Sequence, residues 1–254
     1  MRQDREPDGF RTGTGSEDDG RREGDSSDCV QTSNPFRFVH SRLRMMYGKP
    51  RSLLWGFDRG LPVHRHYIDL FLTEFAADIR GDCLEFQDRT YLDKFSGPQV
   101  RARDVIHLDE SNPHATLIAD ITKPAAMPRH RYDCIICTHV LHSIFDLHAA
   151  LDGLYRSLRP GGVLLAAVPH ISMCDEGFEE YWRFTPLGLR TLMAKAFGDD
   201  HVTVRAYGNS IVAAGELRGM VSDEFTDAEL HTHDARFATE ICGRAVKAAA
   251  SNGD

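Results

Sequence analysis

Acidic residues stand at the ends of successive apolar runs, where a parallel sheet would bring them to one edge. Asp109 closes the run DVIHLD, 24 residues after Glu85, and Asp120 closes the run ATLIAD. A carboxylate in the position of Asp109 can accept two hydrogen bonds from ribose hydroxyls, as in dinucleotide-binding folds. Asp120 is placed to meet the amino group of a base. Acids at strand ends also cap helices and form turns, so the order of the set is more informative than any one member.

Histidines follow the next two apolar runs. Thr138, His139 and His142 come after YDCIIC, and His170 comes after VLLAAVP. A histidine titrates near neutral pH and can take a proton from a reacting group. We rank His142, then His139, then His170 as candidate general bases. The alternative for the first two is a satisfied histidine at the start of a helix.

Strands and helices must alternate to place these residues together. Short apolar runs predict strands at DCLEF, DVIHLD, ATLIAD, YDCIICTHV and VLLAAVP. Helical patterns occupy LHAALDGLYRSLRPGG, closed by Pro-Gly-Gly, and TPLGLRTLMAKAFG, with Thr185 as N-cap and Pro186 at the first position. This alternation predicts an α/β fold with a mostly parallel sheet covered on both faces. The late runs HVTVRAYGN and EICGRAVKA predict an antiparallel pair at one edge.

Three regions are predicted along the chain. Residues 1–32 are rich in Asp, Glu, Arg, Gly and Ser and are predicted to be a disordered tail, because they cannot bury enough surface to offset their ordering entropy. Residues 33–80 are predicted to form a helical cover, in which Val63, Tyr67 and Phe71 keep helical spacing and Gly81 stops the helix. Residues 81–250 form the main domain.

The composition limits the classes of partner that the protein is expected to bind. The net charge of −8 gives no support to binding of nucleic acid or an anionic membrane. No run approaches the roughly 20 apolar residues that span a bilayer, and the N-terminus lacks the apolar core of a signal peptide. We therefore expect a cytoplasmic protein with a small-molecule substrate; the oligomeric state is left open. Four of the six cysteines lie in or beside apolar runs and are predicted to be buried, reduced thiols.

The segment YDCIICTHVLHSIFDLHAALDGLYRSLRPGGVLLAAVP resembles the later half of a class I S-adenosylmethionine-dependent methyltransferase. Its hallmark is a strand, a helix, and LRPGG leading into the next strand. The resemblance covers roughly residues 57–247. The stretches GFDRGLPVHRHYI, DVIHLDESNPHATLIAD, EEYWRFTPLGL and AYGN resemble a narrower bacterial group of type 11-like methyltransferase-domain proteins. The resemblance implies a Rossmann-like fold with a mostly parallel seven-stranded sheet, an antiparallel edge pair, helices on both faces, and S-adenosylmethionine as cofactor.

The loop after the first strand, in GDCLEFQDRTY, departs from the family pattern. Class I methyltransferases usually have Glu-x-Gly-x-Gly-x-Gly there, and the narrower group has Glu-x-Gly-Asp-x-x-Tyr; here Gln87 replaces the remaining glycine. If that position has positive φ, Gln87 costs on the order of 1 kcal/mol of strain, and its side chain enters cofactor space. The resemblance and the strand ends together assign these residues to the cofactor: Glu85, Gln87, Asp88, Tyr91, Asp109, Asp120 and Thr138.

The segment CIICTHVLH superficially resembles a zinc-binding set. Cys134 and Cys137 lie in a predicted strand, however, and residues three apart on a strand point to opposite faces. They therefore cannot converge on one metal, and no metal site is predicted.

Two other motifs have a substrate-binding and a structural interpretation. EEYWRF supplies Tyr181, Trp182 and Arg183 either to the substrate or to a packed aromatic lid. GFDRG places Asp58 and Arg59 either over the site or in a salt bridge that docks the N-terminal helix.

The favoured function is methyl transfer from S-adenosylmethionine to an oxygen or nitrogen atom of a small molecule, such as a sugar or natural-product intermediate. A second hypothesis is a methyltransferase fold repurposed for a cyclisation, elimination or rearrangement without methylation. A third is a non-catalytic pseudoenzyme that binds a partner protein.

Overall fold

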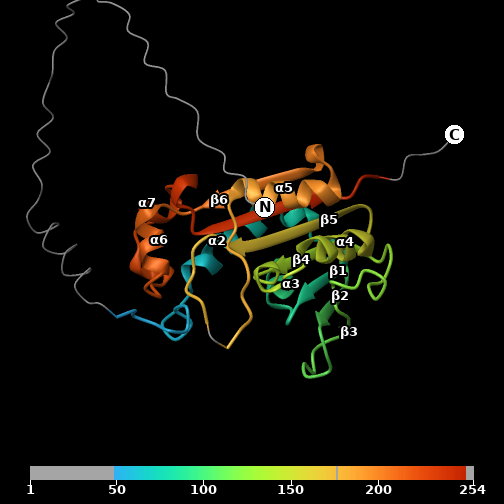
Figure 1. Cartoon of the computed structure of the whole chain (residues 1–254), viewed down its shortest axis with the longest axis horizontal. Coiled ribbons are helices and arrows are strands. Elements are labelled where there is room, and N and C mark those ends of the chain that lie inside the picture. Colours follow the sequence, from blue (N-terminus) through green and yellow to red (C-terminus); the bar gives the residue numbers. More distant parts are fainter. Residues whose placement is uncertain (1–48, 176, 250–254) are drawn as a thin grey trace, which may run out of the picture. The chain divides into compact units, whose positions relative to one another are not determined.

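One seven-stranded sheet organises the computed structural model, which describes residues 49–175 and 177–249. The strand order is β3-β2-β1-β4-β5-β7-β6 (Figure 1). Strands β1 to β5 pair in parallel, whereas β7 runs antiparallel to both β5 and β6, so the predicted sheet and its antiparallel edge are confirmed. The strands are β1 (Gly81–Phe86), β2 (Val100–His107), β3 (Leu117–Ile118), β4 (Tyr132–Thr138), β5 (Leu158–Pro169), β6 (Val202–Tyr207) and β7 (Glu240–Val246).

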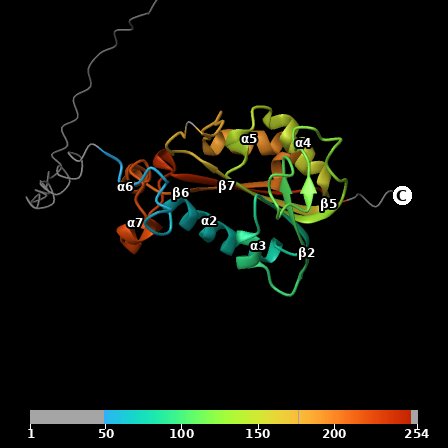
Figure 2. The same ribbon diagram turned by 90° about the horizontal axis from the view of Figure 1, so that it is seen from below.

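Helices cover both faces of this sheet. Figure 2 places α4 and α5 on one side of the strands and α2 and α3 on the other. The α-helices are α2 (Val63–Glu74), α3 (Thr90–Phe95), α4 (Leu147–Ser157), α5 (Pro186–Phe197), α6 (Ser210–Glu216) and α7 (Asp227–His231). Short 3₁₀ helices are η1 (Ala76–Asp78), η2 (Leu141–Ser143), η3 (Asp199–His201), η4 (Ser222–Glu224) and η5 (Ala235–Phe237). None of the helices in the part of the chain that the structure describes is long and apolar enough to cross a membrane.

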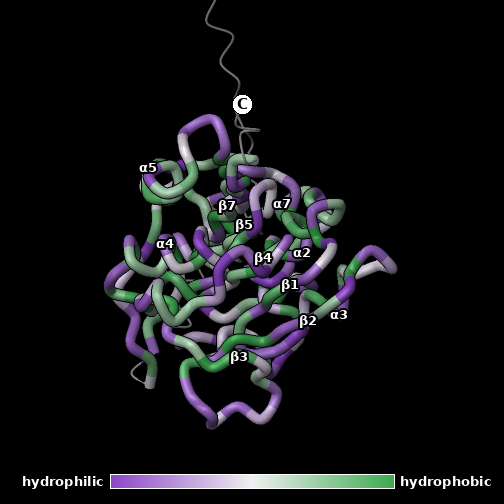
Figure 3. The backbone as a smooth tube through the Cα atoms, turned by 90° about the vertical axis from the view of Figure 1, so that its right-hand side faces the viewer, coloured by the Kyte–Doolittle hydropathy of each residue, from purple (hydrophilic) through white to green (hydrophobic). Residues whose placement is uncertain are grey.

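The two faces form two separate apolar cores. Strand β4 shows the division, because Ile135 and Cys137 belong to the core under α4 and α5, whereas Cys134 and Ile136 belong to the core under α2 and α3. Figure 3 looks along the layers, with the strand labels rising from β3 to β7 between the two sets of helices. Cys134 and Cys137 therefore do lie on opposite faces. Cys83, Cys134, Cys137 and Cys242 are buried free thiols, as predicted.

The helix of the predicted cover is present, but it ends earlier than expected. Its apolar stripe, which includes Tyr67 and Phe71, is buried, and α2 ends at Glu74. Gly81 instead opens β1 with φ +69°, where a Cβ atom would collide with the side chain of Asp133. This close approach, and not a helix stop, requires glycine at that position. The predicted tail and residues 33–48 lie outside the described residues.

The LRPGG segment belongs to β5 and not to the preceding helix. Helix α4 ends at Ser157, and Leu158 is already extended. Pro160 favours extended backbone at Arg159, and Gly161 takes φ +78°. Thr185 caps α5 through the amide of Gly188, with Pro186 at the first position, as predicted.

Candidate functional site

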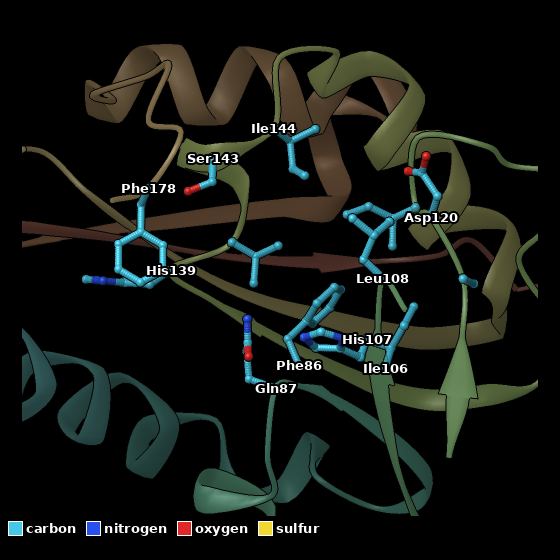
Figure 4. A pocket seen from close by; sticks show the side chains of 13 residues that line it. Phe86, Gln87, Ile106, His107, Leu108, Asp120, His139, Ser143, Ile144 and Phe178 are labelled. Atoms are coloured by element: carbon cyan, nitrogen blue, oxygen red, sulfur yellow. The ribbon is translucent and has the colours of Figure 1, made fainter. Parts of the chain in front are cut away.

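A cavity of about 290 Å³ lies beyond the carboxyl ends of the parallel strands. This is the edge where open α/β sheets bind ligands. The loops after β1, β2, β3 and β4 each contribute to its wall, and Phe178 comes from the segment before α5 (Figure 4). The lining residues are Phe86, Gln87, Ile106, His107, Leu108, Ala119, Asp120, Ile121, His139, Val140, Ser143, Ile144 and Phe178.

Gln87 has the backbone conformation that the family's glycine would provide. Its φ is +69°, its amide donates to the carbonyl of Ile106 at 3.3 Å, and its own carbonyl accepts from Nδ2 of Asn112 at 2.5 Å. Figure 4 shows the side chain pointing into the cavity, toward His139 and Phe178. The predicted condition for strain, on the order of 1 kcal/mol, is therefore met.

Glu85 of β1 binds the backbone at the start of α3, directly after the Gln87 loop. Its buried carboxylate accepts the backbone N–H groups of Tyr91 at 3.0 Å and Leu92 at 2.8 Å. Burial raises the pKa of Glu85 to about 7, against the opposing effect of these two hydrogen bonds. The side chain thus fixes α3 to β1 and is not among the residues that line the cavity.

The other two matching loop residues face away from this cavity. Asp88 accepts the amide of Thr90 at 2.9 Å, and the hydroxyl of Tyr91 accepts from Arg65 at 2.8 Å. Asp88 and Tyr91 line a second cavity of about 270 Å³, together with Arg65. The loop therefore separates Gln87 from both of them.

Of the two acidic strand-end residues, Asp120 lines the cavity. Its carboxylate accepts the hydroxyl of Thr122 at 2.6 Å and the amide of Thr122 at 2.9 Å. These bonds hold the pKa of Asp120 below its usual value, so the group is ionised at neutral pH.

Asp109 lies further out than predicted, because β2 ends at His107. Its side chain is 64% exposed, accepts the amide of Ser111 at 2.9 Å, and lies 3.3 Å from Nδ1 of His107. His107 and Leu108 line the cavity in its place. Both residues could have been found from a correct end of β2. Thr138 is the last residue of β4 and is not among the lining residues.

Of the three candidate bases, His139 is the one that reaches the cavity. It has φ +52°, and its Nε2 lies 3.1 Å from each carboxylate oxygen of Glu240. Its ring stacks on that of His64 with centroids 4.9 Å apart. Burial lowers the pKa of His139 well below its usual value, so the ring favours its neutral form. Glu240 and His64 are not among the site residues predicted from the sequence.

The other two candidate bases are engaged in the surrounding loops. Nε2 of His142 lies 3.3 Å from Glu180, and burial lowers the pKa of His142 to about 4. Its buried Nδ1 has no partner among the described residues. Nδ1 of His170 donates to the carbonyl of Phe184 at 2.5 Å. Neither side chain lines the cavity.

The EEYWRF segment folds over η2. The amides of Tyr181 and Trp182 both donate to the carbonyl of His142, and Nε1 of Trp182 donates to Ile144 at 2.8 Å. Arg183 holds Glu180 at 2.9 Å. None of Tyr181, Trp182 and Arg183 lines the cavity, so these contacts favour the structural interpretation of the segment.

The GFDRG segment makes contacts within the N-terminal region and to η4. Asp58 accepts the hydroxyl of Ser52, and Arg59 pairs with Glu224 at 2.6 Å. Neither Asp58 nor Arg59 lines the two cavities described above. The docking interpretation is therefore favoured for this segment.

Comparison with protein families gives one broad match. A family described as "Methyltransferase domain" matches residues 54–197, which include the cavity walls from β1 to the segment before α5. The chain belongs to this methyltransferase family. The matched region ends with α5, so β6 and β7 of this methyltransferase fold lie beyond it.

Curated relatives match only short stretches. "Probable polyketide synthase 10" of Dictyostelium discoideum is 34% identical over 67 residues, which are 24% of this chain and 3% of that protein. "Probable polyketide synthase 5" of the same organism is 36% identical over 64 residues, 23% of this chain and 2% of that protein. The chain thus spans a few per cent of the length of these relatives.

Solved structures with similar folds include two methyltransferases. A SAM-dependent methyltransferase from Archaeoglobus fulgidus has a TM-score of 0.48 and 11% identity, over 72% of this chain and 94% of that one. The 1,6-didemethyltoxoflavin-N1-methyltransferase from Burkholderia thailandensis, with bound 1,6-didemethyltoxoflavin and S-adenosylhomocysteine, has a TM-score of 0.48 and 13% identity. The latter match covers 84% of this chain and 86% of that one.

Proposed function

We propose that this methyltransferase domain transfers a methyl group from S-adenosylmethionine to an oxygen or nitrogen atom of a small molecule. The observation that carries the proposal is the cavity at the carboxyl edge of the parallel strands, because all of its lining residues lie within the family match. Its walls combine apolar side chains with the carboxylate of Asp120 and the ring of His139.

The residues present fit the adenosine portion of the cofactor. The volume of about 290 Å³ lies at the lower end of ligand pockets. Ile106, Leu108 and Ile121 offer an apolar surface to a base, and the ionised Asp120 offers an acceptor to its amino group. Asp109, which is exposed and follows the lining residue Leu108, is our proposed partner for the ribose hydroxyls. Gln87 would lie against the methionine portion.

The chain's own contribution is to bind, to orient and to accept a proton. When bound, the cofactor supplies an activated methyl group whose sulfonium needs little help as a leaving group. The protein must align the acceptor and exclude water, and Phe178 lines the cavity on the side of His139. We place His139 ahead of His142 and His170 as the group that takes the proton of the acceptor, because it alone of the three lines the cavity.

A second candidate function is a non-methylating rearrangement of a natural product. The observation that favours it is the side chain of Gln87 inside the cavity, where the family has glycine. Its amide has two donor hydrogens and one acceptor oxygen, which could orient a substrate in the space of the methionine portion.

Titration calorimetry with S-adenosylmethionine and S-adenosylhomocysteine tests the proposal. We expect both to bind with one site per chain. Methyl-labelled S-adenosylmethionine, offered with a panel of small alcohols, phenols and amines, should then label at least one acceptor. Failure to bind either molecule would contradict the proposal, whereas binding without transfer to any acceptor would favour the second candidate.

A further inference from the structure

Glu240 is a carboxylic acid buried at the end of the sheet. It is the first residue of β7, it is fully buried, and it pairs with Pro169 of β5 and Tyr207 of β6. Burial of an unpaired carboxylate is costly, so such a group needs a partner. The partner that the structure gives to both of its oxygens is Nε2 of His139, at 3.1 Å.

The backbone of His139 is shaped to make this contact. The residue follows β4 directly and has φ +52°, which is rare for a residue with a Cβ atom. Its amide donates to the carbonyl of Ala167 at 2.9 Å, so the turn is fixed to β5. Backbone strain of this kind is found at functional sites.

A second histidine–glutamate pair holds the ring from the other side. His64 of α2 stacks on His139 with an angle of 24° between the ring planes, and Nδ1 of His64 lies 2.9 Å from Glu216 of α6. Both His64 and Glu216 are buried. His64 therefore packs against the face of the His139 ring, and Glu240 contacts its Nε2 atom.

The remaining nitrogen of the ring is open. Nδ1 of His139 has no hydrogen-bond partner in residues 49–175 and 177–249, and it is not one of the buried unpaired polar atoms there. The side chain is 20% exposed and lines the cavity. Which ring nitrogen carries the proton is set by the bond that the other nitrogen makes.

We infer that Glu240 is a positioning residue that holds His139 through Nε2–H and so leaves the lone pair of Nδ1 to meet the acceptor molecule. This inference deepens the proposed function and rests on it for the proton transfer. In that step the O–H or N–H bond of the acceptor breaks and its electron pair stays on the heteroatom. The proton forms a bond to Nδ1, and the Glu240 carboxylate faces the resulting imidazolium.

The pair makes this role dependent on pH. Burial raises the pKa of Glu240 well above its usual value and lowers the pKa of His139 well below its own. At low pH the His139–Glu240 pair holds one more proton, and Nδ1 of His139 is then protonated and cannot act as a base. The form of the ring with a free lone pair on Nδ1 therefore appears as the pH rises. The charged or titratable groups that act on the pair are His64 and Arg65 of α2, Glu216 of α6, His142 of η2 and Arg183.

A purely structural role for Glu240 is the alternative, because the same contacts join α2, α6, β4 and β7. Nuclear magnetic resonance of histidine-¹⁵N-labelled protein separates the two without any substrate. In the wild type we expect a neutral His139 ring with the proton on Nε2 at high pH, and protonation of Nδ1 as the pH falls. His139→Gln identifies the signal.

Glu240→Gln keeps a carbonyl to accept Nε2–H but removes the charge. We expect the Nδ1 protonation of His139 to move to lower pH by at least about one unit. Glu216→Gln is the matched comparison: Glu216 also raises the pKa of His139, but its carboxylate contacts His64 and not His139, so we expect a smaller shift of the His139 titration. An unchanged His139 titration in Glu240→Gln would overturn the inference, as would a proton on Nδ1 throughout the wild-type titration. If Glu240→Gln does not fold, Glu240→Asp is the substitute, and it should weaken the effect of the carboxylate on the His139 titration. A His139 titration in Glu240→Asp identical to that of the wild type would contradict the inference.

Calorimetry and turnover separate this inference from the proposed function. S-adenosylmethionine should bind Glu240→Gln with wild-type affinity, while methyl transfer falls at least about tenfold and its pH profile shifts. If the wild-type protein does not bind the cofactor, the proposed function is contradicted. The nuclear magnetic resonance titration would then still test the His139–Glu240 pair.

Discussion

At the scale of single residues, Gln87 decides how the site is used. The residue holds φ +69° and lines the cavity. In a working methyltransferase, Gln87→Gly should tighten S-adenosylmethionine binding, because it relieves about 1 kcal/mol of strain and clears volume. In a repurposed enzyme the same change should abolish the native reaction without creating methyl transfer. Calorimetry and turnover of this one variant distinguish the two, and no change in either would contradict both interpretations.

Asp109 and Asp120 are predicted to bind different parts of the cofactor. We expect Asp109→Ala to weaken S-adenosylmethionine binding about ten- to a hundredfold, through loss of the acceptor for the ribose hydroxyls. Asp120→Asn is the companion variant, because Asp120 lines the cavity. Calorimetry on folded protein provides the measurement. Unchanged affinity in folded Asp109→Ala would contradict the assignment of Asp109 to the ribose hydroxyls.

Glu85 should make stability fall as the pH rises. Burial raises its pKa to about 7 in the folded state, above the ordinary value of 4.5, so the folded state binds the proton more tightly. The stabilisation is complete below about pH 4.5 and is lost as the pH rises through about 7, by about 3 kcal/mol. In Glu85→Gln the difference in unfolding free energy between pH 5 and pH 8, measured by urea denaturation, should be smaller than in the wild type. Equal pH dependence in both proteins would show that Glu85 does not titrate in this range.

The identity of residues at strand ends was predictable, but their partners were not. Strand ends carry sequence signals, so Asp120 and His139 were identified in advance. Glu240 pairs with a residue 101 positions away, and nothing in a local pattern encodes that contact. Asp109 was placed too close to the cavity because the end of an apolar run is not the end of its hydrogen-bonded strand.

At the scale of elements, α4 packs unusually close to the turn after β3. A Cβ atom at Gly153 would collide with the carbonyl oxygen of Ile121, a residue that lines the cavity. Gly153→Ala should therefore lower the free energy of unfolding by about 1–2 kcal/mol, although alanine favours helix by about 1 kcal/mol. Gly188→Ala is the control, because its Cβ would meet only the Thr185 hydroxyl, at 3.1 Å. A stabilised Gly153→Ala in urea denaturation would show that α4 can move away.

The short helices were not predicted, for a physical reason. Helices α3, α6 and α7 have 6, 7 and 5 residues, too few for an apolar period to emerge. Two of them nevertheless carry capping signals. Asn209 caps α6 through two amides, and Thr226 with Glu229 forms a capping box at α7. In helix α3 the N-cap residue Arg89 makes no capping bond; Asp88 accepts the amide of Thr90, and Glu85 of β1 accepts those of Tyr91 and Leu92.

At the scale of the whole molecule, residues 51–62 precede the two apolar cores and are joined to the rest of the protein by backbone contacts. Among residues 49–175 and 177–249, the two apolar cores begin at Leu84 and Val63. The stretch just before them is joined to the segment around Val221 by backbone contacts, including Pro62 to Val221 and the amide of Ser222 to the carbonyl of Leu61 at 2.9 Å. The amide of Arg51 likewise donates to Arg218 at 2.7 Å.

Deletion of residues 1–32 should leave the melting temperature nearly unchanged, because their composition offers hardly any large apolar side chain to bury. Deletion of residues 1–61 is the matched control. It removes the Arg59–Glu224 ion pair and the Leu61 contact, and it should lower the melting temperature by several degrees. Differential scanning calorimetry of the two truncations against the full chain measures both effects. A large drop for the shorter deletion would show that the first 32 residues pack on the folded protein, which would contradict the disorder predicted from their composition.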